Sequence, residues 1–160
     1  MIFVTVGTQL PFERLVKGVD EWARKHSEEE VYVQSGETEY RPTHCKCVPF
    51  TSPQQWEELF QRATRVVSHA GMGTLLKSLD YGKPLIIMPR IAMLGEHRND
   101  HQLATAKRFA HFANITVVHD EFQLAAALNC AAPNSSTDGN NNKNLRALIS
   151  DVRRFIHTGA

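Results

Sequence analysis

The 160-residue chain carries 18 basic and 17 acidic residues, so its formal net charge at pH 7 is +1. This balance argues against a general nucleic-acid-binding protein, which would present a basic face. The length fits one domain over 1–160, and hydrophobic residues make up 42% of the chain, which is enough for a full core. No apolar run approaches the roughly 20 residues of a membrane span, and no signal peptide opens the chain, so we expect a protein that is soluble by itself.

The three cysteines are odd in number and show no secretory context, which predicts reduced thiols in a cytosolic protein. Cys45 and Cys47 follow His44, but this spacing is not that of a zinc knuckle and no second pair exists. We therefore expect no metal at this place.

In chain order, apolar runs and helical periodicity alternate along the sequence. Short apolar segments predict strands over 2–6, 31–34, 46–50, 66–68, 85–88 and 115–118. Apolar residues at helical spacing predict helices over 11–25, 52–62, 74–81, 100–112, 121–128 and 145–156. The stretch 131–144 is of low complexity, and we expect it to be mobile. The alternation predicts an α/β protein with a doubly wound, mainly parallel sheet.

A turn with two glycines joins the fourth strand to the helix that follows it. His69-Ala70-Gly71-Met72-Gly73 comes directly after Val66-Val67-Ser68, and the helical pattern then begins. The backbone N–H groups and the positive end of the helix dipole would face whatever lies above this turn, which suits a phosphate or diphosphate. Leu76 stands where a dinucleotide fingerprint has its third glycine. A tight turn that binds nothing is the alternative.

A dense polar group, Glu96-His97-Arg98-Asn99-Asp100-His101-Gln102, follows the fifth strand. His97 and His101 would share a helix face, but Arg98 stands where a metalloprotease helix has its glutamate, so a zinc site is disfavoured. The simplest structural role in this group is helix capping by Asn99 or Asp100, which would account for one of the acidic residues. The crowding of the others after a strand end favours a cleft whose side chains hydrogen-bond several hydroxyl groups, as a sugar requires.

These motifs, with 82–90 (GKPLIIMPR) and the opening FVTVGT, resemble the C-terminal, donor-binding domain of glycosyltransferase family 28. The resemblance is to its stand-alone PssE-type members, which are related to the small catalytic subunit of the two-subunit dolichol-linked GlcNAc transferase and to MurG. It implies a Rossmann-like C-terminal half of a GT-B enzyme, here on a polypeptide of its own. The implied reaction is an inverting transfer from a UDP-sugar to a polyprenyl-diphosphate-linked acceptor in exopolysaccharide or surface glycan biosynthesis. The UDP-sugar is the donor substrate, and no cofactor or metal is implied. A membrane-anchored, PssD-like subunit would bind the acceptor and hold this chain at the cytoplasmic face of the membrane.

The resemblance also implies roles for individual residues. Diphosphate contacts fall on His69, Gly71, Met72, Gly73 and Thr74. Phe50 would meet the uracil, Gln102 with its neighbours Asp100 and His101 would meet the sugar, and Gly7 and Thr8 would face the cleft between the lobes. The candidate catalytic residues are His69, Glu96 and His97, while the general base is expected on the partner or at the interface.

One position departs from the family pattern. Relatives have an acid six residues after the first glycine of the turn, where it pairs with the ribose hydroxyls, and Lys77 stands there instead. An ammonium group cannot accept those hydrogen bonds. Asp80, three residues later on the same face, would be the substitute.

Two other functions stay open at this point. A non-catalytic nucleotide-sugar-binding or regulatory subunit would have the same binding motifs without turnover of its own. A dinucleotide-dependent oxidoreductase needs an acid at the end of the second strand, where only Glu37 is offered, and the incomplete glycine motif disfavours it.

Overall fold

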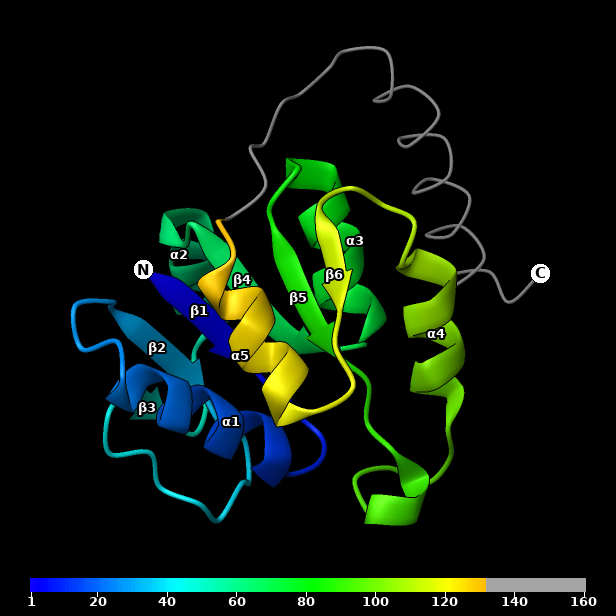
Figure 1. Ribbon diagram of the computed structural model, residues 1–160, viewed down its shortest axis with the longest axis horizontal. Coiled ribbons are helices and arrows are strands. Elements are labelled where there is room, and N and C mark those ends of the chain that lie inside the picture. The colour runs from blue at the N-terminus through cyan, green and yellow to red at the C-terminus, as the bar shows by residue number, and fades with distance from the viewer. Residues whose placement is uncertain (132–160) are drawn as a thin grey trace.

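Six parallel strands form one sheet in the part of the chain that the structure describes, residues 1–131, and helices cover both faces (Figure 1). The structure is a computed structural model. The strands are β1 Ile2–Thr5, β2 Val31–Gln34, β3 Lys46–Val48, β4 Arg65–His69, β5 Leu85–Met88 and β6 Ile115–Val117. The α-helices are α1 Glu13–Arg24, α2 Pro53–Arg62, α3 Met72–Tyr81, α4 His101–Phe109 and α5 Glu121–Asn129, and a short 3-10 helix, η1 Ala92–Leu94, follows β5. The predicted doubly wound α/β class is confirmed.

The strand order is β3-β2-β1-β4-β5-β6, and every neighbouring pair is parallel. The chain therefore moves outward from β1 to β3, returns to β4 beside β1, and then moves outward in the other direction. The switch point lies between β1 and β4, where Thr5 is in register with Ser68. In open α/β sheets ligands collect outside the carboxyl ends of the strands at such a point. The loops that carry Gly7 and Gly71 leave the sheet there.

The side chains of each strand alternate between two hydrophobic cores because successive residues of a strand face opposite sides of the sheet. Ile2 and Val4 pack under α1 and α5, whereas Phe3 between them packs under α2 and α3. Helices α1 and α5 accordingly lie together on one face of the sheet in Figure 1. The apolar faces of the helices within residues 1–131 pack against these cores.

Local sequence signals explain the helix ends. Ser52 begins α2 with a capping box, in which its side chain accepts from the backbone N–H of Gln55 and the Gln55 side chain accepts in return. Gly82 ends α3 in the left-handed conformation, with φ of 60°. Asp100 occupies the N-cap position of α4, but its carboxylate makes no cap. Instead it accepts from the N–H of Ala92, 2.8 Å away, so the predicted capping by this side chain is wrong.

Several predicted bounds shift by a few residues. Helix α3 begins at Met72 rather than at residue 74, because Gly71 is already the extended N-cap. Helix α4 ends at Phe109, and the chain then turns tightly, with the Phe112 N–H donating to the Phe109 carbonyl. The expected mobile stretch 131–144, apart from its first residue, and the expected helix 145–156 lie outside the described residues. Within the described range, no helix combines the length and apolarity that crossing a membrane requires.

Candidate functional site

The first turn of α3 is open to a ligand. Gly71 is its N-cap and provides no side-chain cap, and no acidic residue occupies the first turn. The N–H groups of Met72, Gly73 and Thr74 therefore have no partner within the helix and point out of its positive end. Gly73 is exposed, and a Cβ added to it would meet no atom within 4 Å. An anion has room to approach this backbone closely.

The imidazole of His69 lies between the two glycine loops of the switch point. A Cβ on Gly7 would be 2.7 Å from Cε1 of His69, and a Cβ on Gly71 would be 2.8 Å from the same atom. Gly7 also has a φ of 81°, which favours glycine. Both glycines are therefore required for the ring to occupy this place beside the first turn of α3.

Burial lowers the pKa of His69 to about 4, and the positive charge of Arg90 acts in the same direction. The ring is consequently neutral near pH 7. A neutral imidazole has one N–H group and can donate through only one of its two nitrogens. The Ser68 hydroxyl donates its proton to the Thr5 carbonyl, so at 3.3 Å from Nδ1 it accepts the ring N–H, and His69 is held from the β1 side.

Gln34 links the carboxyl ends of three strands, and the sequence analysis did not single it out. This buried side chain accepts from the Thr5 hydroxyl at 2.6 Å and donates to the carbonyls of Gly7 at 3.0 Å and Pro49 at 2.9 Å. It thereby fixes the loops after β1 and β3 on either side of the site. A glutamine that closes the apolar run Val31-Tyr32-Val33 was the available signal.

Arg90 fastens the loop after β5 to the loop after β1. Its guanidinium donates to the carbonyls of Val6, Leu10 and Pro11. The Cζ atom of Arg90 lies over the ring of Phe12, 4.6 Å from the ring centroid. Burial lowers the pKa of Arg90 to about 10, so the group still carries its charge near pH 7. These bonds fix the two loops beside His69 relative to each other.

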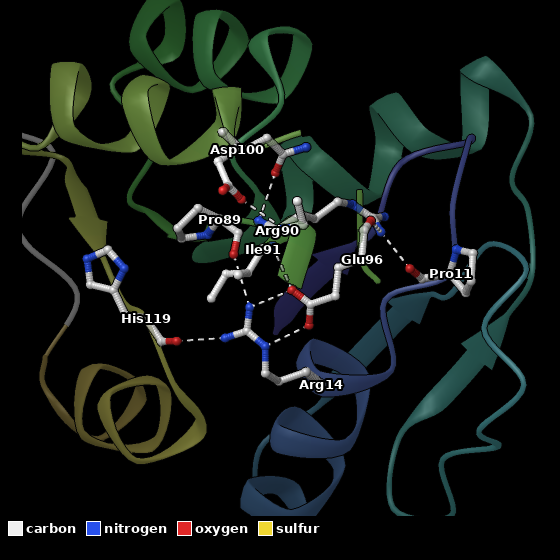
Figure 2. A network of polar contacts seen from close by, with 10 residues as sticks. Pro11, Arg14, Pro89, Arg90, Ile91, Glu96, Asp100 and His119 are labelled. Carbon is white, nitrogen blue, oxygen red and sulfur yellow. Dashed lines mark hydrogen bonds and ion pairs between the residues drawn. The ribbon is translucent and has the colours of Figure 1, made fainter. Parts of the chain in front are cut away.

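A second arginine holds the same loop from α1. Figure 2 shows Arg14 between Glu96 and two backbone carbonyls, those of Pro89 and His119. Both oxygens of Glu96 accept from Arg14, and Oε2 also accepts from the N–H of Ile91 at 2.9 Å. The carboxylate is therefore engaged in holding its own loop. The assignment of Glu96 as a catalytic residue stays a prediction.

The predicted histidine pair is brought together by the start of α4. The rings of His97 and His101 meet edge to face, with centroids 4.5 Å apart, and Asn99 hydrogen-bonds His101 Nδ1. Nδ1 of His97 is buried and has no hydrogen-bond partner among the described residues. Burial and the charge of His101 lower the pKa of His97. Residues 1–131 contain no group of three histidine, cysteine or acidic side chains arranged to hold a metal ion.

Two predicted donor contacts have other surroundings than expected. Gln102 is buried, and its carbonyl oxygen accepts from the N–H of Arg90 at 3.1 Å. Its contact with a sugar stays a prediction and would rest on the amide nitrogen. Asp80 is exposed in the last turn of α3, seven residues beyond Gly73 and so about 10 Å further along the axis. Lys77 forms an ion pair with Glu57 of α2.

Two further candidates lie on loops at the same edge of the sheet. Phe50 follows β3 and its side chain is half exposed, so its ring is free to meet a base. Thr8 is exposed in the loop after β1. The fold therefore gathers most of the predicted donor-binding residues at the carboxyl edge, and Asp80 lies away from it.

A family model matches this architecture over almost the whole chain. The model for the glycosyltransferase family 28 C-terminal domain covers residues 1–157. The chain belongs to this family. The predicted relation is confirmed, and it makes the chain a glycosyltransferase donor-binding domain.

A curated relative has a related sequence, and two solved structures share the fold. The mouse UDP-N-acetylglucosamine transferase subunit ALG13 is 35% identical over 81 residues, which are 48% of this chain and 6% of that protein. An NMR solution structure of ALG13 has a TM-score of 0.60 and 21% identity, and the match covers 92% of this chain and 94% of that one. The crystal structure of the kitacinnamycin glycosyltransferase has a TM-score of 0.61 and 17% identity, and the match covers 95% of this chain and 39% of that one. The chain therefore spans only a small part of the curated relative.

Proposed function

We propose that this chain is the donor-binding, catalytic subunit of a two-component inverting glycosyltransferase that uses a UDP-sugar. One observation carries the proposal: the uncapped first turn of α3, with its open Gly73, lies beside the neutral His69 at the switch point. Several backbone N–H groups there converge on one place, and the His69 ring lies beside them. They suit the diphosphate of a nucleotide sugar.

The same donors supply the chemistry that this half of the enzyme has to provide. When the glycosidic bond to UDP breaks, negative charge builds up on the leaving diphosphate. N–H groups that are already in position stabilise this charge without reorganisation. Gln34 and Arg90 hydrogen-bond the surrounding loops to each other, which limits how far these loops have to reorganise.

The acceptor side is proposed to come from a second polypeptide. The curated relative is named as a subunit of a UDP-N-acetylglucosamine transferase. That name supports a lobe that works with a PssD-like, membrane-anchored partner. The acceptor would be a polyprenyl-diphosphate-linked sugar at the cytoplasmic face of the membrane, in exopolysaccharide or surface glycan biosynthesis.

Calorimetric titration of the purified chain with UDP tests the donor site, with NADH as the ligand control. We expect UDP to bind and His69→Ala to weaken this binding at least tenfold, because the ring that lies between the two glycine loops, beside the first turn of α3, is lost. His111→Ala, which changes an exposed histidine at the end of α4, is the matched control and should bind UDP as the unchanged chain does. Binding of NADH without UDP would overturn the proposal.

The alternative is a nucleotide-sugar-binding subunit without turnover of its own. The engagement of the Glu96 and Asp100 carboxylates in loop contacts favours it, because neither is free to act as a base. Transfer activity measured with the co-expressed partner separates the two functions. Loss of transfer in His69→Ala at saturating donor supports a catalytic subunit, and full transfer under the same conditions supports the binding subunit.

A further inference from the structure

The loop between β5 and α4 depends on one ion pair for its position. Arg14 Nε lies 2.7 Å from Glu96 Oε1, and Nη2 lies 2.8 Å from Oε2, although the two residues are 82 positions apart. Only 12% and 9% of the two side chains are exposed. Such a bidentate pair has a narrow range of geometries, so it specifies where the loop lies relative to α1.

Apolar packing contributes little to the placement of this loop. Helix η1 has no buried residue, and the side chains of Met93 and Leu94 at its tip are 92% and 57% exposed. Burying two charges costs free energy that their attraction only partly offsets, so a pair of this kind is a weak source of stability. Its better-supported effect here is to select one arrangement of a loop that has no core of its own.

The residue next to Glu96 is the one that the arrangement positions. His97 contacts His101, and the carbonyl of Glu96 before it accepts from Arg90 at 3.2 Å. The Arg90 guanidinium also donates to the carbonyl of Val6, next to Gly7 and the His69 ring, so the loop is tied to the diphosphate end of the site. The buried Nδ1 of His97 has no partner among the described residues, which fits a side chain held in place by its backbone. Figure 2 shows how Arg14 and the backbone N–H of Ile91 donate hydrogen bonds to the Glu96 carboxylate on this loop.

We propose that Arg14 and Glu96 are positioning residues, whose ion pair holds His97 at the donor diphosphate. The proposal rests on the proposed function of the site. It assigns Glu96 a role through its neighbour, in place of direct contact with the substrate.

The direction in which Glu96→Gln changes the affinity for UDP distinguishes a positioning role from a simple effect of charge. Glu96→Gln removes a negative charge near a site for an anion, so charge alone predicts tighter UDP binding. Positioning predicts weaker binding, because the amide cannot accept both Arg14 bonds with the same strength. Glu96→Gln keeps the size of the side chain and an oxygen for the Ile91 N–H. Arg14→Lys, which keeps the charge and loses the two-pronged geometry, provides a second variant.

UDP titrations of these variants, alone and combined with His97→Ala, test the proposal. We expect Glu96→Gln and Arg14→Lys to weaken UDP binding about tenfold, the scale of one hydrogen bond to a charged group, and to have no further effect once His97 is alanine. Glu30→Gln, which breaks the exposed pair with Lys46, is the control and should leave binding unchanged. Equal or tighter UDP binding by Glu96→Gln, or an undiminished effect in the His97→Ala background, would overturn the proposal.

A second measurement needs no ligand. In NMR spectra of the free chain, the His97 ring signals should shift or broaden in Glu96→Gln and stay unchanged in Glu30→Gln. Unchanged His97 signals in Glu96→Gln overturn the positioning role, even if UDP does not bind. A failure of the unchanged chain to bind UDP, together with the expected shift, would instead count against the proposed donor site.

Discussion

The His69 imidazole fills the space that a β-carbon on Gly71 would need. An added Cβ would lie 2.8 Å from Cε1 and closer still to Nε2 of the ring. The strand end and the helix start of the glycine turn are thereby locked together through one side chain. A side chain at Gly71 would therefore clash with His69, whereas one at the next glycine, Gly73, would meet no protein atom within 4 Å.

Gly71→Ala should destabilise the fold and weaken UDP binding, because the His69 ring has to leave its place. Overpacking of this kind typically costs about 1–3 kcal/mol in the free energy of unfolding. Urea denaturation followed by circular dichroism measures the stability, and calorimetry measures the affinity. Unchanged values for both would show that the ring moves freely and is not held by the turn.

Gly73→Ala should separate binding from stability. Its Cβ meets no protein atom within 4 Å, and alanine favours a helix over glycine by about 0.5–1 kcal/mol. We therefore expect equal or higher stability, with UDP binding weakened at least tenfold because the methyl group enters the space of the diphosphate. Thermal unfolding and calorimetry on the same preparation check both halves. Unchanged UDP affinity would place the ligand away from this turn.

Stability should depend on pH through His69. Its pKa is about 4 in the folded chain against 6.5 for an ordinary histidine, mainly because of burial. The unfolded chain therefore binds a proton that the folded chain does not, and stability falls as the pH is lowered from about 6.5 towards 4. At 1.36 kcal/mol per pKa unit the loss approaches about 3 kcal/mol.

Urea titrations at several pH values measure this dependence. His69→Gln should flatten the curve between pH 4 and pH 6.5, whereas His111→Ala should leave it as it is. In the unchanged chain, NMR should find the His69 ring neutral down to about pH 5. An ordinary titration of His69 near pH 6.5 would contradict the expectation.

Gln34→Leu should cost about 2–3 kcal/mol of stability, since it leaves buried partners on Thr5, Gly7 and Pro49 without their hydrogen bonds. UDP affinity should fall as well, because the loops after β1 and β3 lose their link. Gln54→Leu, an exposed position in the first turn of α2, is the control. Equal stability of the two variants would show that Gln34 carries no such link.

Periodicity alone was enough to predict each described strand and α-helix. The β-branched run at the start and the capping box at Ser52 act through neighbours in the chain, so they are visible in a linear pattern. The glycine turn could be recognised for the same reason, since a strand end, two glycines and a helix start are consecutive. At this turn the helix starts two residues earlier, and the strand ends one residue later, than predicted.

What the sequence by itself determined is therefore the α/β class, the order of the elements and the place of the glycine turn. The tertiary structure decided which polar groups are free. Glu96 and Gln102 look alike in the sequence as members of a polar cluster, yet one pairs with Arg14 and the other with the Arg90 backbone. These partners are 82 and 12 residues away, and only the folding of the chain around the sheet brings them within hydrogen-bond distance. The neutral state of His69 has the same origin, because its burial depends on loops from two different strands.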